Sequence, residues 1–347
     1  MVLTLSESDI AKVLTYEALI PAMERALAAF SAGRVIQPIS DVLTIEEGKR
    51  FLSIMPAVVE YGMGVKLVCS YPKNAGSRFP THLSMIMLLE PETGQPLALL
   101  DGRLIAEMRT AAASAAVTQH IGPSNAKILS LVGSGAQAVA HLKALRVAND
   151  FDEVRVWSRT PEHARRFAEQ HGAKSMELEA AVRGADIIVT TTSSTFPLVQ
   201  GAWLKAGAHV NAVGALPNGR ELGDAVMQNI LIVDSRDAVL HGSGDVVLSN
   251  ASIFAEAGEI FSGLKSVPRT TTTVFKSAGI AAQDIAAARL VYDAVARAGD
   301  LEQAVRARLG GSQAVRASLD TGGCHFGKAN GDELTDQLTE MSGRLFR

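Results

Sequence analysis

Apolar residues recur every three or four positions near the start of the chain, at Met23, Leu27 and Phe30. This spacing predicts helical structure over residues 1–33, which Gly33 ends. Between residues 42 and 100 the pattern changes to short apolar runs separated by glycine and proline, which predicts closely spaced strands of a largely antiparallel sheet. The alanine-rich stretch 104–120 contains neither glycine nor proline and predicts another helix.

Beyond Lys127 the pattern alternates between compact apolar runs and amphipathic stretches. Continuous apolar strands that alternate with helices indicate a parallel sheet covered on both faces. Asp284 is expected to cap a later amphipathic helix that returns the chain to the first domain. The predicted strands are 128–132, 154–157, 187–190, 208–213 and 230–233, and the predicted helices between them are 136–148 and 161–170.

Composition narrows the class of protein. The 347 residues suggest about two domains. With 33 basic and 36 acidic residues, a polybasic nucleic-acid surface is not expected. Two cysteines cannot form a disulfide framework, and the eight histidines show no metal-ligand spacing, so no metal is expected. No signal peptide and no long apolar run is recognisable, so we expect a cytoplasmic protein without a membrane partner.

A glycine motif follows the first strand of the second half. Residues 133–138 read Gly-Ser-Gly-Ala-Gln-Ala, a G-x-G-x-x-A pattern between a predicted strand and a predicted helix. In that context Gly133 permits a tight turn, Gly135 lets the backbone approach a pyrophosphate, and the helix N-terminus at Ala136 and Gln137 supplies N–H donors. The alternative is a tight turn that binds no ligand.

The end of the second strand favours NADP(H) as the cofactor. An acidic residue in this region would hold the ribose 2′-hydroxyl of NAD. This chain instead has Ser158-Arg159-Thr160, which suits a 2′-phosphate. NAD(H) remains possible, with Arg159 stacking on the adenine.

Two basic residues are candidates for the chemistry. Lys66 lies in the middle of a predicted strand, where it faces either water or a polar cleft; desolvation in a cleft would suit it to proton transfer. Arg109 precedes a run of small residues and could bind a carboxylate in bidentate fashion, or form a surface ion pair with Glu107 or Asp101. On composition alone Arg50 and Arg103 are equally possible carboxylate ligands.

Asp224 lies in a loop after the strand at 208–213. Loops at the carboxyl ends of parallel strands are where such sheets bind substrates. Asp224 is therefore either an acid–base residue or a helix N-cap, and the residue type and position alone favour the cap.

Several separated motifs together give the chain a sequence that resembles the ornithine cyclodeaminase/mu-crystallin family over about residues 35–298. The sequence is most similar to the mu-crystallin/ketimine reductase branch of that family. Many motifs in one order are more specific than a single glycine loop. Besides the glycine loop they are Gly64-Val65-Lys66-Leu67-Val68, Phe79-Pro80-Thr81-His82, Asp101-Gly102, Arg109-Thr110-Ala111-Ala112, Trp157-Ser158-Arg159-Thr160, Asn211-Ala212-Val213-Gly214, Arg220-Glu221-Leu222, Ser243-Gly244-Asp245-Val246 and Thr273-Val274-Phe275-Lys276-Ser277.

The resemblance implies an α/β fold in which a Rossmann dinucleotide-binding domain is inserted in a discontinuous α+β domain for substrate binding and dimerisation. The corresponding boundaries are residues 1–118 plus 284–347 for the discontinuous domain and 119–283 for the Rossmann domain. It also implies a homodimer. The role of the tail after Ala298 stays open.

The resemblance also implies roles for individual residues. Lys66 would transfer the proton, and Arg109 with Arg50 would bind the substrate carboxylate. The acidic position of the family is Gly223 here, which leaves the role of the neighbouring Asp224 in doubt. The cofactor would be contacted by Thr81, His82, Arg109, Thr190, Thr191, Val213 and Ser277.

The expected activity is NAD(P)H-dependent reduction of a cyclic ketimine or α-imino acid, such as Δ1-piperideine-2-carboxylate or Δ1-pyrroline-2-carboxylate, to the L-amino acid. Three alternatives stay open. They are a redox-neutral ornithine or lysine cyclodeaminase, an alanine-type amino-acid dehydrogenase, and a non-enzymatic NADPH-dependent binding protein.

Overall fold

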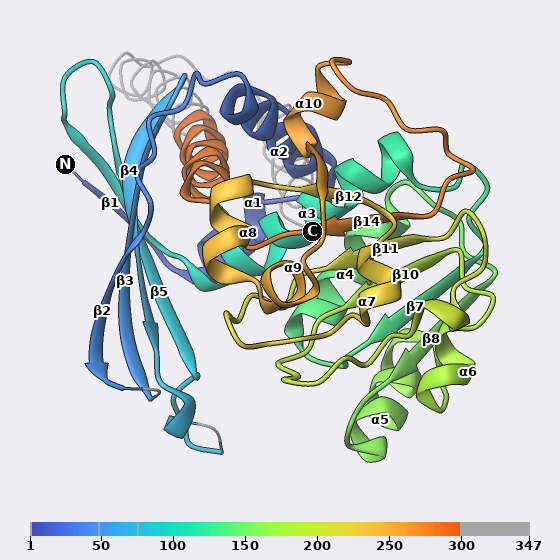
Figure 1. Cartoon of the computed structure of the whole chain (residues 1–347). Helices are drawn as coiled ribbons and strands as arrows, with labels where there is room; N and C mark the ends of the chain where they lie inside the picture. Colours follow the sequence, from blue (N-terminus) through green and yellow to red (C-terminus); the bar gives the residue numbers. More distant parts are fainter. Residues whose placement is uncertain (1, 48, 75, 299–347) are drawn as a thin grey trace, which may run out of the picture. The chain divides into compact units, whose positions relative to one another are not determined.

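The computed structural model describes residues 2–47, 49–74 and 76–298 (Figure 1). Its chain divides into two compact units, residues 1–290 and 291–347. Of the second unit, residues 291–298 are described and are helical. The first unit contains two β-sheets and the helices that pack against them, as the α/β prediction requires.

The first sheet has six strands in the order β1-β6-β5-β4-β3-β2. Strands β2 to β6 pair with one another in antiparallel fashion, as the short apolar runs predict, while β1 lies parallel to β6. Figure 1 shows β2, β3, β4 and β5 as neighbours. The strands are β1 (Leu3–Leu5), β2 (Asp41–Glu46), β3 (Arg50–Val59), β4 (Gly62–Ser70), β5 (His82–Leu89) and β6 (Pro96–Asp101).

The prediction of helical structure throughout residues 1–33 is wrong at the start of the chain. Residues Leu3–Leu5 form β1, followed by α1 (Glu7–Val13) and α2 (Tyr16–Ser31). The side chains of Ser6 and Thr15 each accept a hydrogen bond from a helical N–H and so begin α1 and α2. Two N-caps this close together divide the segment into separate helices.

The second sheet has eight parallel strands in the order β13-β12-β14-β11-β10-β7-β8-β9. The five strands predicted from Lys127 onward are confirmed, whereas the short β9, β13 and β14 had not been predicted. The strands are β7 (Ile128–Val132), β8 (Glu153–Trp157), β9 (Lys174–Ser175), β10 (Ile187–Thr190), β11 (His209–Ala212), β12 (Ile230–Val233), β13 (Ile253–Glu256) and β14 (Thr273–Lys276).

Helices connect these parallel strands, as a Rossmann-like sheet requires. All residues of β10, β11 and β14 are buried, and β7 is buried from Leu129 onward, so both faces of the sheet centre are covered. The helices are α4 (Ala136–Arg146), α5 (Pro161–His171), α6 (Leu178–Val182), α7 (Asp224–Met227), α8 (Arg236–Gly242), α9 (Gly244–Ser249) and α10 (Ala257–Phe261), and Pro72–Asn74 and Gly201–Trp203 are 3₁₀ turns.

Helix α3 (Arg103–Ile121) contacts β5 of the first sheet and both β11 and β14 of the second. Its run of small residues from Ala111 to Ala116 is buried throughout, which allows neighbouring elements to approach closely. The predicted helix over residues 104–120 is thereby confirmed. Arg109 is therefore carried by a helix that contacts both sheets.

A helix begins at Ala281, so the prediction that Asp284 caps it is wrong; Asp284 lies in its first turn and is fully buried. The helix packs against β4. A Cβ at Gly64 would lie 2.9 Å from Ile285 Cδ1 and 2.3 Å from the carbonyl oxygen of Met87. The bare backbone there lets the helix lie directly on the strand face that carries Lys66.

The predicted division into residues 1–118 plus 284–347 and residues 119–283 stays a prediction. Among the described residues, no helix is both long enough and apolar enough to cross a membrane.

Candidate active site and cofactor pocket

The glycine loop connects β7 to α4, as its motif predicts. Gly133 has a φ of 121°, and a Cβ there would lie 2.4 Å from Thr191 Oγ1 and 3.0 Å from the Thr191 carbonyl oxygen. Both the backbone angle and this close approach therefore require glycine. A Cβ at Gly135 would meet nothing within 4 Å. Gly135 is also the N-cap of α4 and offers no side chain to its N–H groups, so this helix end fits a dinucleotide pyrophosphate.

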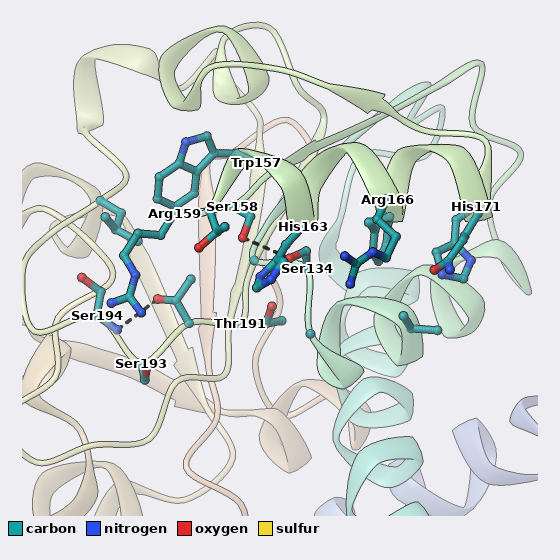
Figure 2. Close-up of a pocket in the computed structure, with 18 residues that line it drawn as sticks. Ser134, Trp157, Ser158, Arg159, His163, Arg166, His171, Thr191, Ser193 and Ser194 are labelled. Atoms are coloured by element: carbon teal, nitrogen blue, oxygen red, sulfur yellow. Dashed lines mark hydrogen bonds between the residues drawn. The ribbon is translucent and has the colours of Figure 1, made fainter. Parts of the chain in front are cut away.

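A cavity of about 520 Å³ opens above this loop (Figure 2). Several predicted cofactor residues line it, namely Gly133, Gly135, Ser158, Arg159, Thr160 and Thr191. Ser134 Oγ donates a 3.0 Å hydrogen bond to Ser158 Oγ, which joins the glycine loop to the end of β8. The rest of the lining is Ser134, Val139, Trp157, His163, Arg166, Phe167, Gln170, His171, Thr192, Ser193, Ser194 and Leu198.

Helix α5 supplies basic residues that the sequence analysis missed. His163, Arg166 and His171 line the cavity together with Arg159, and in Figure 2 the three α5 side chains project from one side of the helix. Burial, together with nearby cations of α4, lowers the pKa of His171. The i, i+3 spacing of His163 and Arg166 directly after the Ser158-Arg159-Thr160 stretch was the signal available in the sequence.

Other predicted cofactor residues lie outside the cavity lining. Ala136 and Gln137 begin α4. Val213 directly follows β11, and its N–H donates to the Thr190 carbonyl. Ser277 is buried after β14, where its hydroxyl donates to Asp234 at 2.7 Å.

Glu221 is a buried carboxylate that the sequence analysis did not single out. It accepts hydrogen bonds from Thr190 Oγ1 at 2.9 Å, from both Thr192 N and Thr192 Oγ1, and from Gly214 N at 2.9 Å. Asp245 in turn accepts from the Glu221 N–H at 2.8 Å. Because these donors lie at the ends of β10 and β11, Glu221 holds together two loops beside the cavity.

A second cluster joins Lys66, Arg109 and Asp284, and all three side chains are buried. Lys66 Nζ donates to Asp284 Oδ2 at 2.5 Å, and Arg109 Nε donates to Asp284 Oδ1 at 3.1 Å. Arg109 Nη1 also donates to Gln283 Oε1 at 2.8 Å. The two cations are recognisable from the sequence, but the carboxylate and the amide that hold them are not.

The side chain of Lys66 is only 4% exposed. It therefore does not face water, which was one of the two positions that the strand pattern allowed. Desolvation lowers the pKa of Lys66, the positive charge of Arg109 lowers it further, and the charge of Asp284 opposes both effects. Two cations beside one carboxylate leave a buried excess of positive charge. Such a site suits a ligand carboxylate.

The loop after β14 lies directly against Arg109. Gly279 has a φ of 81°, and a Cβ there would lie 2.8 Å from Arg109 Nη2. Asp234 accepts hydrogen bonds from the Gly279 N–H at 2.6 Å and from Ser277 Oγ, and burial raises the pKa of Asp234. The loop is thus fixed where it confines the guanidinium.

Four more predicted residues, Thr81, His82, Arg50 and Asp224, lie outside both the cavity lining and the Lys66–Arg109–Asp284 cluster. His82 stands opposite Ser70 in the first sheet, burial lowers its pKa, and its Nδ1 lies 3.2 Å from Thr81 Oγ1. Arg50 pairs with Glu46 at 3.0 Å. Asp224 is the first residue of α7, is largely exposed and pairs with Arg220, while Gly223 is the N-cap.

A metal site is not formed by the described residues. No group of three or more histidine, cysteine, aspartate or glutamate side chains in that part of the chain could hold an ion.

Comparison with known proteins identifies the family. The family model for the ornithine cyclodeaminase/mu-crystallin family matches residues 1–299, so the resemblance extends further toward the N-terminus than the motifs indicated. The ketimine reductase mu-crystallin of Macropus fuliginosus is 43% identical over 286 residues, which cover 79% of this chain and 91% of the relative.

Two solved structures have the same fold. The Δ1-pyrroline-2-carboxylate reductase of Thermococcus litoralis, in complex with NADH and L-proline, has a TM-score of 0.81 at 31% identity and covers 86% of this chain and 98% of its own. An archaeal alanine dehydrogenase dimer with bound NAD also has a TM-score of 0.81, at 30% identity, and covers 86% and 97%. The chain belongs to the ornithine cyclodeaminase/mu-crystallin family.

Proposed function

We propose that this protein reduces the C=N bond of a cyclic α-imino acid, such as Δ1-piperideine-2-carboxylate or Δ1-pyrroline-2-carboxylate, to the L-amino acid, using a reduced nicotinamide dinucleotide. The observation that carries the proposal is the buried pair of cations, Lys66 and Arg109, that share the single carboxylate of Asp284. Relatives named as ketimine and pyrroline-carboxylate reductases support the same reaction.

Each cation has a separate task in this reaction. Arg109 binds the substrate carboxylate, and each charge-assisted hydrogen bond of this kind contributes about 1.5–3 kcal/mol. Lys66 donates a proton to the imine nitrogen, which becomes the amine of the product. The bound dinucleotide supplies the hydride for the imine carbon. Burial excludes water from both cations, which strengthens their interaction with the substrate anion.

The proposed cofactor is NADP(H). Arg159, His163 and Arg166 line the cavity beside Ser158 and Thr160, and the lining contains no carboxylate that would repel a 2′-phosphate. Planar guanidinium groups suit phosphate recognition. NAD(H) remains the alternative, because the two solved relatives carry NADH or NAD.

We further propose that the protein is a homodimer that pairs through the outer face of the first sheet. Leu67 stands opposite Met85 and lies on the face of β4 turned away from Lys66. The large apolar side chains of this face are 41–53% exposed, namely Leu43, Leu67, Leu83, Met85 and Met87. An apolar face of this extent suits a second copy of the chain, and the solved alanine dehydrogenase is a dimer.

The dimer has its own test. The double variant Leu67→Glu/Met85→Glu places like charges at the proposed interface, so we expect a monomer in sedimentation velocity where the unaltered chain sediments as a dimer. Lys12→Glu, on the exposed surface of α1, is the control and should leave the dimer intact. A monomeric unaltered chain would contradict the proposal.

The reaction is tested by following nicotinamide absorbance with purified protein. We expect NADPH oxidation with Δ1-piperideine-2-carboxylate or Δ1-pyrroline-2-carboxylate, and a higher KM for NADH than for NADPH. Oxidation only with pyruvate and ammonia would indicate an alanine-type dehydrogenase. Ammonia release from ornithine or lysine without a net absorbance change would indicate a cyclodeaminase, and saturable NADPH binding without any turnover would indicate a binding protein.

The proposed location is cytoplasmic, where a reduced dinucleotide is available as a co-substrate. Fractionation of the source cells tests this location. Recovery of the chain outside the soluble cytosolic fraction would contradict it.

A further inference from the structure

We propose that Asp284 is a positioning residue for the reaction: its carboxylate keeps Lys66 charged as the proton donor and aims Arg109 at the substrate. This inference rests on the proposed function. It adds a residue from a distant helix to the two cations that the motifs identified.

The geometry gives each carboxylate oxygen a separate partner. Oδ2 accepts from Lys66 Nζ at 2.5 Å, and Oδ1 accepts from Arg109 Nε at 3.1 Å. Lys66 keeps two ammonium N–H donors, and Arg109 keeps Nη2, none of which has a hydrogen bond to another described residue. The carboxylate therefore fixes both cations while leaving donors on each for a ligand.

The charges around Lys66 come from three elements. Asp284 faces it from the helix that begins at Ala281, and Arg109 faces it from α3. Asp234, after β12, interacts electrostatically with Arg109. Of these groups Asp284 is the carboxylate that contacts Lys66, so it supplies the negative charge that opposes desolvation and the repulsion by Arg109.

The proton balance of the reaction requires this charge. In each turnover Lys66 passes one proton from its ammonium group to the substrate nitrogen and is left as a neutral amine. It regains a proton from solvent after the product has left the site. A buried lysine beside an arginine, without a counter-charge, favours the neutral amine. Without the carboxylate of Asp284, a smaller fraction of Lys66 would therefore begin the cycle as the ammonium group that donates the proton.

Arg109 is also held in place by residues other than Asp284, namely Gln283 and Gly279. Gln283 Oε1 accepts from Nη1 at 2.8 Å, and Gly279 lies against Nη2. Loss of the carboxylate should therefore affect proton donation by Lys66 more than placement of Arg109. This predicts a larger change in kcat than in KM for the imine.

The test is Asp284→Asn, which keeps the size of the side chain and removes its charge. We expect kcat for Δ1-pyrroline-2-carboxylate reduction to fall at least 10²-fold, KM to change less, and the alkaline limb of the kcat profile to move down by about one pH unit or more. The ¹³Cε shift of labelled Lys66, assigned with Lys66→Met, should titrate at correspondingly lower pH. Asp284→Glu keeps the charge and should restore both the limb and the Lys66 titration.

Asp186→Asn is the matched control. Asp186 directly precedes β10 and accepts hydrogen bonds from the backbone N–H groups of Lys127 and Ile128, where β7 begins. This is the end of the second sheet opposite to the glycine loop. This variant should lose stability without moving the pH profile. An unmoved limb in Asp284→Asn, or an unshifted Lys66 titration, would overturn the proposal.

Two further results remain decisive. If Asp284→Asn does not fold, Asp284→Glu alone decides. Because glutamate keeps the charge but moves the carboxylate, we expect changed kcat and KM with an unmoved alkaline limb. Wild-type values of kcat and KM would refute the proposal. If the unaltered chain does not reduce imines, the proposed function fails, while the Lys66 titration still tests whether Asp284 holds the lysine in its charged form.

Discussion

We expect Lys66→Ala to lower kcat for imine reduction by about 10²–10⁴-fold, the range that a positioned proton donor contributes. The side chain is buried against Asp284, so water cannot take over proton transfer without entering the space that alanine leaves. NADPH affinity should stay unchanged, because Lys66 does not line the cavity at the glycine loop. Stopped-flow absorbance gives the rate of reduction, and fluorescence titration gives the dissociation constant of NADPH.

Lys205→Ala is the control for removing a lysine from an ion pair. Lys205 pairs with Asp186 before β11 and is partly exposed. Its loss should leave kcat unchanged, because Lys205 contacts neither Lys66 nor the cavity lining. Thermal unfolding of both variants separates lost folding from lost chemistry. Wild-type turnover in Lys66→Ala would refute its assignment as the proton donor.

We expect acid to destabilise the folded protein between pH 6.5 and about 4, by about 3 kcal/mol for each of two buried histidines. Burial lowers the pKa of both His141 and His209 to about 4. Both rings are neutral in either state above pH 6.5. Below it the unfolded chain binds protons that the folded chain refuses, so the free energy of unfolding falls until the folded pKa is reached.

The two histidines are held in a polar network inside the protein. His141 lies between the Gln137 carbonyl oxygen at 2.7 Å and Ser114 Oγ at 3.0 Å. His209 lies between Thr273 Oγ1 at 2.7 Å and Asn211 at 3.3 Å. A protonated ring would carry two donors and a charge into this space, which explains why the neutral form is favoured.

Urea unfolding at pH 7 and pH 5 measures this effect. His141→Gln and His209→Gln should each remove about 2 kcal/mol of the pH-dependent loss at pH 5, even where the variant is less stable at pH 7. His241→Gln, on the exposed surface of α8, is the control and should leave the difference between the two pH values unaltered. A variant with the pH dependence of the control would show that its histidine is not the source.

Local patterns were sufficient for most of the second sheet. The strands Ile128–Val132, Ile187–Thr190 and Ile230–Val233 are largely apolar and almost wholly buried, so the hydrophobic pattern alone predicts them. The glycine loop was predictable because its G-x-G-x-x-A motif lies directly between a predicted strand and a predicted helix. At the N-terminus the competing caps at Ser6 and Thr15 outweighed helical periodicity.

What the sequence by itself determined about this protein is five strands of its second sheet, the dinucleotide loop and the identity of the two cations. Only the tertiary structure decided that Lys66 is buried, that α5 adds Arg166 to the cavity, and that Asp284 joins Lys66 to Arg109. The alternation of side chains along a strand predicts which face of the sheet a residue lies on. It does not predict which element packs on that face. The cover here is a helix more than two hundred residues further along the chain, which lies on β4 because glycine backbone allows it to approach.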